Sequence, residues 1–205
     1  MISCTPKGYS QQLEEIIAFN DTFQALPKPL TWTDFMDTLE QDSTQKLPDG
    51  KWFWNSGSGQ YYFSLKNNLV NGTIIITDST QNILETGFFK NGVQHGFFKY
   101  YIDGYLGSTR LYEFGSEKEE ILYYKNGYLK RKVVTVTLSQ NECLTLCTFY
   151  HETGFISSQG FNDLNGKTRL WEYFDADGVK IMEEIYEDGK LISNKNYLSI
   201  DKYKE

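Results

Sequence analysis

The sequence predicts a mainly β protein made of repeated β-hairpins, with a small helical cap at its N-terminus. Three observations lead to this fold class. Glycines recur at a fixed interval, turn dipeptides separate short aromatic or β-branched runs, and the first 46 residues follow a different pattern. The expected domains are therefore a cap over residues 1–46 and a repeat domain over residues 47–205. A chain of 205 residues has room for one domain or two small ones.

Five glycines define the frame of the repeat. They are separated by 22, 24, 70 and 23 residues, and the gap of 70 is three steps of about 23: Gly50, Gly72, Gly96, Gly166 and Gly189. The two middle positions of this frame, near Lys118 and Cys143, hold other residues. A fixed period of this size is typical of repeat architectures, in which each unit packs on its neighbours.

Each unit contains two strand-like runs and two turns. Runs rich in aromatic and β-branched residues fit a pleated, half-buried surface. Turn dipeptides with glycine favour hairpins because glycine adopts positive φ at little cost. Eight of them occur: Asp49-Gly50, Asn71-Gly72, Asn91-Gly92, Asp103-Gly104, Asn126-Gly127, Asn165-Gly166, Asp177-Gly178 and Asp188-Gly189. We therefore expect a mostly antiparallel sheet over residues 50–192, with a strand every 11–12 residues.

The units resemble the bacterial variant of the MORN repeat, found in YwqK-like proteins that are often labelled antitoxins. The best matches are Glu85 to Tyr101 and Gly166 to Leu191, and the resemblance covers about residues 50–192. Residues 117–147 depart from it, since the framing glycines are missing and Lys130 to Leu146 reads as a longer β run. The resemblance implies antiparallel hairpins in one elongated, twisted sheet. It implies no cofactor and no catalytic residues.

The first 46 residues predict two helices, near residues 10–24 and 33–41. Leu13, Ile16 and Ile17 have helical spacing, Ser10 is a suitable N-cap, and prolines at 27 and 29 end this element. We expect the two helices to pack on the first hairpins and to cover the edge that a terminal repeat would otherwise expose. These residues carry three lysines and seven acids, so they supply −4 of the total charge of −7.

Aromatic residues are abundant, with 15 Tyr and 14 Phe. Most are expected to form core and cross-strand pairs. An exposed subset would suit protein binding, because aromatic side chains give large contact areas at low entropy cost. The candidate anchors are Trp52, Trp54, Tyr101, Tyr112, Tyr124, Trp171 and Tyr173. Because successive side chains of a strand point to opposite faces, only some of them can face outward.

Catalytic and metal-binding motifs are scarce in the sequence. The two histidines, His95 and His151, lie in turn-like segments, and no nucleophile elbow, phosphate loop or zinc helix occurs. Adjacent acids such as Glu119-Glu120 and Glu183-Glu184 point to opposite faces of a strand and cannot act as a pair. We therefore expect no enzyme activity, no cofactor and no metal site. The acidic charge argues against nucleic-acid binding, which needs clustered Lys and Arg.

The cysteines leave two locations open. Cys143 and Cys147 are expected on one face of a strand, about 13 Å apart, too far for a disulfide. Such free thiols suit the cytoplasm. Cys4, in Met1-Ile2-Ser3-Cys4, resembles the acylated cysteine of a lipoprotein signal, although no apolar segment precedes it here. The alternative is therefore a lipoprotein of the cell envelope or periplasm, if an upstream signal lies outside this numbering.

Two function classes follow from these observations. The first is an immunity protein or antitoxin that binds one cognate toxin and neutralises it by occlusion without chemistry of its own. The acidic charge of the chain would attract a basic toxin. The second is an envelope-associated scaffold, anchored to a membrane only if Cys4 is lipidated. A carbohydrate-binding module with exposed Trp and Tyr is a third class, but no specific motif indicates it.

Overall fold

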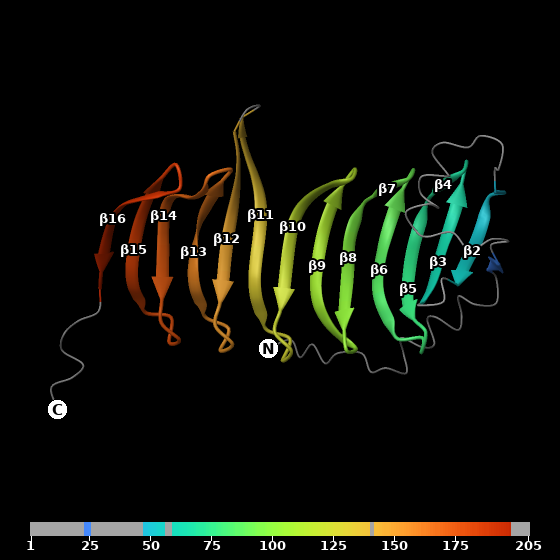
Figure 1. The fold of residues 1–205 in the computed structure, drawn as a ribbon, viewed down its shortest axis with the longest axis horizontal. Helices are drawn as coiled ribbons and strands as arrows, with labels where there is room; N and C mark the ends of the chain where they lie inside the picture. Colours follow the sequence, from blue (N-terminus) through green and yellow to red (C-terminus); the bar gives the residue numbers. More distant parts are fainter. Residues whose placement is uncertain (1–22, 26–46, 56–58, 140–141, 198–205) are drawn as a thin grey trace. The chain divides into compact units, whose positions relative to one another are not determined.

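The computed structural model describes residues 23–25, 47–55, 59–139 and 142–197. These residues form sixteen strands and no helix, which confirms the predicted mainly β class (Figure 1). The chain divides into two compact units, Met1–Tyr105 with Tyr112–Ser116, and Leu106–Leu111 with Glu117–Glu205.

In the first unit, neighbouring strands pair in the order β1-β2-β3-β5-β6-β8, and β4 and β7 extend β3 and β6. These strand pairs are antiparallel except β1 with β2, which is parallel. The strands are β1 (Gln24–Ala25), β2 (Gly50–Asn55), β3 (Gly59–Lys66), β4 (Leu69–Val70), β5 (Gly72–Asp78), β6 (Ile83–Lys90), β7 (Val93–Gln94) and β8 (Gly96–Ile102).

In the second unit, each strand pairs with its neighbour in sequence, and every pair is antiparallel. The strands are β10 (Ser116–Tyr123), β11 (Leu129–Ser139), β12 (Glu142–Tyr150), β13 (Ile156–Asp163), β14 (Gly166–Phe174), β15 (Lys180–Glu187) and β16 (Lys190–Asn196). β9 (Tyr105–Glu113) contributes residues to both units.

The glycine frame appears as the starts of alternate strands. These strands begin at Gly50, Gly72, Gly96, Ser116, Glu142, Gly166 and Lys190. The steps between them are 20 to 26 residues, so the period persists where the framing glycines are missing. The run expected over Lys130 to Leu146 is divided between β11 and β12, which pair through Ser139 and Glu142. The chain therefore reverses direction within that run.

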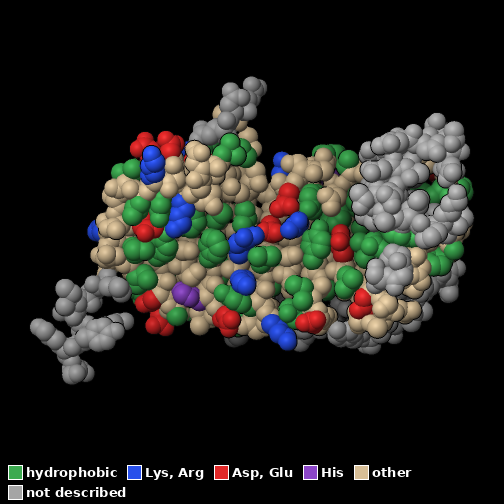
Figure 2. All heavy atoms as spheres, viewed as in Figure 1, with side chains coloured by type: hydrophobic (Ala, Val, Ile, Leu, Met, Phe, Trp, Pro, Cys, Tyr) green, Lys and Arg blue, Asp and Glu red, His purple; other side chains and the backbone are tan. Residues whose placement is uncertain are grey.

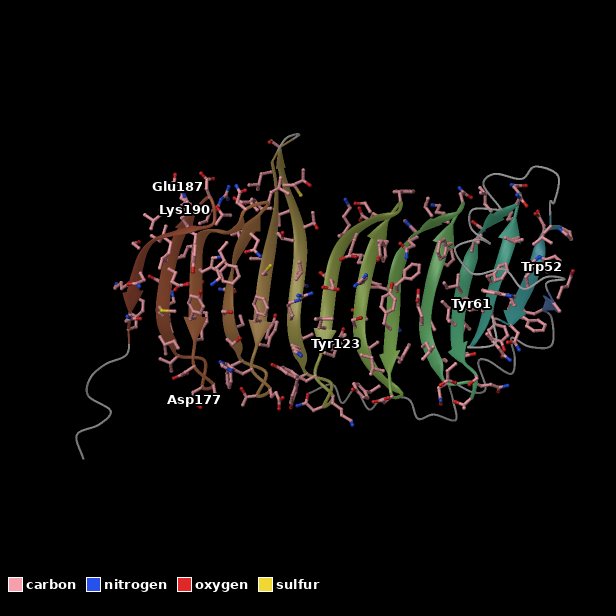
Figure 3. All side chains as sticks on the ribbon, in the orientation of Figure 1. Trp52, Tyr61, Tyr123, Asp177, Glu187 and Lys190 are labelled. Atoms are coloured by element: carbon pink, nitrogen blue, oxygen red, sulfur yellow. The ribbon has the colours of Figure 1, made fainter. Side chains whose placement is uncertain are left out.

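All eight predicted turn dipeptides place their glycine at positive φ, from +76° at Gly189 to +154° at Gly50. In three of them the preceding residue is also left-handed: Asn91, Asp103 and Asp188. Two successive left-handed residues define the type I′ turn, whose twist matches that of a hairpin. Figure 3 shows Glu187 and Lys190 at one such tip and Asp177 at the other end of the strands in the same unit.

A second turn type repeats in the middle of the units. In each case the first residue donates its N–H to the fifth carbonyl, and the fourth donates to the first, at 2.8–3.1 Å. The turns span residues 78–82, 124–128, 151–155 and 175–179. The Asp175 carboxylate accepts hydrogen bonds from the amides of Asp177 and Val179, so this acidic segment is a hairpin turn.

The predicted helical cap lies mostly outside the described residues. Within them, Gln24–Ala25 is a strand paired with Trp52–Phe53, so the helix expected near residues 10–24 is wrong at its end. Phe23 makes an edge-to-face contact with Tyr62, with ring centres 5.5 Å apart. At this edge of the sheet the sequence predicts a covering helix. Instead, β1 pairs with β2 and forms hydrogen bonds with backbone N–H and C=O groups of the edge strand.

The core of the first unit lies on one face of its strands. Its buried members are Trp52, Trp54, Phe63, Leu65, Val70, Ile74, Phe89, Phe98 and Tyr112. Cross-strand pairing explains the cluster: Trp52 lies opposite Phe63, and Trp54 stacks on Tyr61 with ring centres 4.7 Å apart. Figure 3 labels Trp52 and Tyr61, which lie on the paired strands β2 and β3.

In both units a large aromatic ring covers a glycine on the neighbouring strand. A Cβ at Gly87 would lie 2.3 Å from the Phe98 ring, and one at Gly160 would lie 2.4 Å from the Trp171 indole. Both glycines precede their ring by 11 residues. Only glycine lets the ring lie this close to the strand backbone.

Substituting the framing glycines by valine should strain the backbone. Gly96 has φ +75° and Gly166 has φ +113°, and no atom lies within 4 Å of an added Cβ at either position. We expect Gly96→Val and Gly166→Val each to lower the free energy of unfolding by about 1–2 kcal/mol, from strain alone. Thermal unfolding measures this, with Gly96→Asn as the milder control. Equal melting temperatures for wild type and both valine variants would contradict the assignment.

The turn at Asp78 should depend on pH. Hydrogen bonds from the Asn82 side chain, then from Thr80, lower the pKa of the Asp78 carboxyl to about 2. Because this value lies below the unfolded value of about 3.9, the stabilisation is present above about pH 4 and is lost as pH falls through 2. An NMR titration should find the Asp78 midpoint near 2, and Asn82→Ala should raise it. An Asp78 midpoint at the ordinary value would refute the bond network.

Candidate partner-binding surface

Four of the seven candidate anchors are buried. Trp52, Trp54 and Tyr112 belong to the core of the first unit, with 5%, 6% and 7% of their surface exposed. Trp171, in the second unit, is 3% exposed, and its indole N–H donates to the Phe161 carbonyl at 2.9 Å. These four side chains are buried between strands, so their aromatic rings are not available on the surface for a partner.

The other three candidates, Tyr101, Tyr124 and Tyr173, are half-buried. Tyr124 donates its hydroxyl proton to the Tyr150 carbonyl at 2.8 Å, which links two successive hairpins. It also lines an open depression of about 370 Å³ with Lys125, Asn126 and Glu152. Tyr173 belongs to a charged aromatic cluster in the second unit.

An exposed aromatic patch lies on β6 and β8 of the first unit. We define it as Leu84, Phe88, Phe97 and Tyr101. The first three are 41%, 41% and 57% exposed, and Tyr101 is half-buried. All four alternate with core-facing residues, since Phe89 and Phe98 point to the opposite face and are buried. The pairing of Thr86 with Lys99 brings the two strands together at the centre of this patch.

The sequence itself carries a signal for this patch in the alternation of aromatic residues along β8. In Gly96-Phe97-Phe98-Lys99-Tyr100-Tyr101, one face of the strand must carry Phe98 and Tyr100, and the other Phe97 and Tyr101. Phe98 is fully buried and Tyr100 packs against the core, so Phe97 and Tyr101 lie on the open face. Alternation identified the two sets, but only packing decides which set is covered.

A strained turn adds another exposed aromatic residue to this unit. Phe114 has φ +49°, a conformation that costs free energy in a residue with a bulky side chain. Its ring is 71% exposed, lies 5.1 Å from the His95 ring, and has the Lys90 ammonium 5.6 Å from its centre. The equivalent positions of other type I′ turns hold Asn or Asp, as at Asn91 and Asp103.

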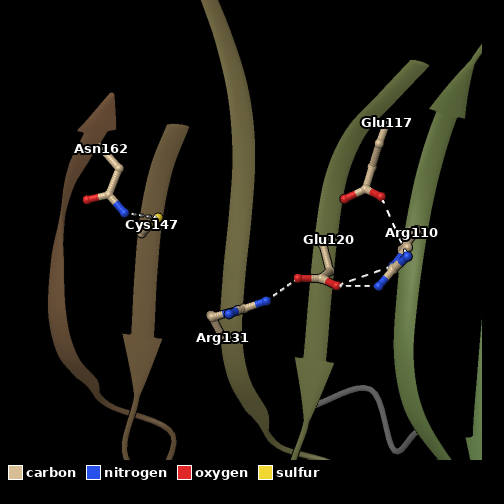
Figure 4. Close-up of polar contacts among 6 residues, drawn as sticks. All are labelled: Arg110, Glu117, Glu120, Arg131, Cys147 and Asn162. Atoms are coloured by element: carbon tan, nitrogen blue, oxygen red, sulfur yellow. Dashed lines mark hydrogen bonds and ion pairs between the residues drawn. The ribbon is translucent and has the colours of Figure 1, made fainter. Parts of the chain in front are cut away.

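In the second unit, ion pairs link the side chains of neighbouring strands from β9 to β11. Glu120 accepts hydrogen bonds from Arg110 at 2.9 and 3.2 Å, and it also accepts one from Arg131 (Figure 4). On the opposite face of β10, Glu119 pairs with Lys132 at 2.9 Å. The adjacent acids thus point apart, as alternation predicted. The Lys130-Arg131-Lys132 cluster forms contacts with Tyr124, Glu120 and Glu119 in turn.

Cross-strand pairing brings two carboxylates together. The sequence alone does not indicate this pair, because it depends on the register of β14 with β15. Glu172 of β14 lies directly opposite Glu183 of β15. The Lys180 ammonium bridges them, at 2.5 Å from Glu172 and 2.8 Å from Glu183. These Lys180 hydrogen bonds, helped by Gln159 at Glu172 and Tyr197 at Glu183, hold the pKa of both carboxyls below the usual value. The lowered pKa favours the ionised form of both carboxyls, and the single Lys180 ammonium between them offsets part of their mutual repulsion.

His151 and Cys147 make hydrogen bonds between neighbouring elements of the second unit. His151 Nε2 lies 3.0 Å from the Phe174 carbonyl, which joins two successive turns. Cys147 is buried, Asn162 donates to its sulfur at 3.6 Å, and burial raises the pKa of its thiol (Figure 4). Cys143 and Cys147 are both free thiols on one strand, as predicted. Within the described ranges, no three His, Cys, Asp or Glu side chains are grouped to hold a metal ion.

Figure 2 shows apolar side chains interleaved with acidic and basic ones on one face of the molecule. No helix in the described part of the chain is long and apolar enough to cross a membrane. Comparison with protein-family models and with curated proteins found no match for this chain.

Proposed function

We propose that this chain is a non-enzymatic protein-binding repeat protein of the immunity or antitoxin type, which neutralises one cognate toxin by stoichiometric binding and occlusion. The exposed aromatic patch carries this proposal. Phe97, Phe88 and Leu84 expose 41–57% of their surface on one face of the paired strands β6 and β8. Adjacent exposed aromatic and apolar side chains mark protein-interaction sites more often than scattered ones do.

The composition of the patch suits a protein partner. Phe and Tyr contribute large contact areas with few rotatable bonds, and Lys99 adds one cation between them. The chain as a whole carries a charge of −7, which would raise the association rate of a basic partner. The resemblance to bacterial MORN-variant proteins points to the same class of function.

Phe97 should contribute strongly to partner binding. Phe97→Asp removes a ring that is 57% exposed and places a charge in the patch. We expect it to weaken binding of the toxin encoded beside this gene by at least about tenfold, because truncating a central aromatic anchor typically costs more than 1 kcal/mol. Calorimetry and rescue of toxin-expressing cells measure the effect.

Leu164→Asp is the matched control, because Leu164 is fully exposed in a turn of the second unit and the variant makes the same change of charge. It should bind like wild type. If wild-type protein fails to rescue the cells, and no complex elutes from size-exclusion chromatography at micromolar concentration, the neutralising role is wrong. If Phe97→Asp and Leu164→Asp bind equally well, partner binding stands but this patch is not its site.

A further inference from the structure

Lys167 lies inside a cage of aromatic rings in the second unit. Its ammonium nitrogen is 4.7 Å from the centre of the Trp171 ring and 5.1 Å from the centres of both the Tyr173 and Tyr186 rings. Glu184 completes the cage, with a carboxylate oxygen 3.6 Å from the same nitrogen. We call Trp171, Tyr173, Glu184 and Tyr186 the ammonium cage.

The cage is held together by its own hydrogen bonds. Tyr173 and Tyr186 both donate their hydroxyl protons to Glu184, the second at 2.8 Å. Lys167 donates to the two tyrosine oxygens at 2.5 and 3.4 Å. The Glu184 side chain is 14% exposed and Trp171 is 3% exposed, whereas the Lys167 side chain is 37% exposed. The site therefore has a buried aromatic base and an opening to solvent.

A strained bulge forms one side of this cage. Between β13 and β14, Phe161 pairs with Thr168 and Gly160 pairs with Trp171, so β14 has two extra residues at this point. One of them, Arg169, has φ +61°, which is unfavourable for a residue with a side chain. Bulges redirect side chains next to functional sites, and such strain persists where it serves a site. Here the bulge separates Lys167 from Trp171 while both stay on one face.

We propose that the ammonium cage is a binding site for an external alkylammonium group, and that Lys167 is its built-in competitor. One indole ring, two tyrosine hydroxyls and one carboxylate surround the cation, so the site offers a cation–π contact together with oxygen acceptors for the N–H groups of a primary ammonium. The ligand chemistry is therefore a primary alkylammonium such as that of a lysine side chain, and choline, which has no N–H group, is the contrasting probe.

The tether of Lys167 explains how such a site would select its ligand. Lys167 lies on the same strand as two cage residues, so its effective concentration at the cage is on the order of millimolar or higher. Its flexible stem and partial exposure let the ammonium leave for water. A free amine must therefore outcompete Lys167, or gain further contacts with the protein. This inference does not depend on the proposed toxin partner.

The test uses the isolated full chain with choline chloride and Nα-acetyl-lysine methylamide as separate probes. The Trp171 indole N–H resonance, assigned with a Trp171→Phe sample, reports occupancy of the cage by NMR. We expect a saturable shift in wild type, and a dissociation constant at least about tenfold lower in Lys167→Ala, where the tethered competitor is removed. Lys190→Ala makes the same charge change at the first residue of β16, next to a hairpin turn, and should behave like wild type.

Further variants separate the cage from a general charge effect. Tyr186→Leu removes one ring and should abolish the shift in the wild-type background, and Glu184→Gln should weaken both probes. The lysine probe should bind more tightly than choline, because only a primary ammonium can donate to the tyrosine and glutamate oxygens; tighter binding of choline would overturn the proposal. If Lys167→Ala does not fold, Lys167→Thr replaces it and the wild-type and Tyr186→Leu titrations still decide. Equal binding by wild type and Lys167→Ala, or no shift of the Trp171 resonance, would overturn the proposal.

Discussion

Replacing Phe98 by alanine is expected to lower the free energy of unfolding by about 3–5 kcal/mol. The Phe98 side chain has no exposed surface. Its ring makes edge-to-face contacts with Phe89 and Tyr112, at 5.5 and 5.2 Å between ring centres, and it covers Gly87. Removing it deletes these contacts and leaves a cavity that the glycine cannot fill.

The neighbouring residue provides a matched control. Phe97 precedes Phe98 on the same strand, points to the other face and is 57% exposed. Phe97→Ala should change the free energy of unfolding by only about 0.5 kcal/mol, as is usual for exposed positions. Denaturant unfolding of both variants measures the difference. Similar losses in the two variants would contradict the assignment of the core to the Phe98 face of β8.

The turns were the most predictable part of this fold. Asn-Gly and Asp-Gly restrict the backbone locally, so the positive φ of Gly92, Gly104 and Gly189 follows from the dipeptides themselves. The period of the strands follows from the spacing of such turns. Where the glycines are missing, at β11 and β12, the sequence predicts a single long strand. The reason is that valine, threonine and leucine favour a strand on both sides of the chain reversal.

Burial of individual aromatic residues could not be predicted in the same way. Alternation separates Trp52 and Trp54 from Phe53, but both sets are aromatic and either face suits a core. The decision depends on contacts with distant residues, such as Phe63 opposite Trp52. Four candidate anchors are therefore buried, while Phe88 and Phe97, which were not candidates, are exposed.

The ammonium cage depends on a feature that has no local sequence signature. Arg169 adopts a left-handed conformation without being Gly, Asn or Asp, so the sequence does not indicate the bulge between Lys167 and Trp171. Simple alternation does place Lys167, Trp171 and Tyr173 together. It does not indicate that Tyr186 and Glu184 from the next strand close around the lysine, because that requires the register of β14 with β15.

A methyl group at Gly160 should be strongly destabilising, although alanine is usually tolerated in strands. A Cβ there would lie 2.4 Å from the Trp171 indole, a distance at which one of the two must move. Trp171 is fixed by burial and by its hydrogen bond to the Phe161 carbonyl. We expect Gly160→Ala to lower the free energy of unfolding by about 2–3 kcal/mol, as overpacking does. This exceeds the gain of up to about 1 kcal/mol from restricting the unfolded chain.

A double-mutant cycle separates this clash from a general intolerance of the strand. In a Trp171→Ala background, the space above Gly160 is empty, so adding Gly160→Ala should be neutral or slightly stabilising. Gly154→Ala is the control for backbone strain without a clash, because Gly154 has φ +93° and no atom within 4 Å of an added Cβ. It should lose only about 1 kcal/mol. If Gly160→Ala costs the same with and without the indole, the ring does not set the requirement for glycine, and the shared 11-residue spacing of Gly87 with Phe98 and Gly160 with Trp171 has another cause.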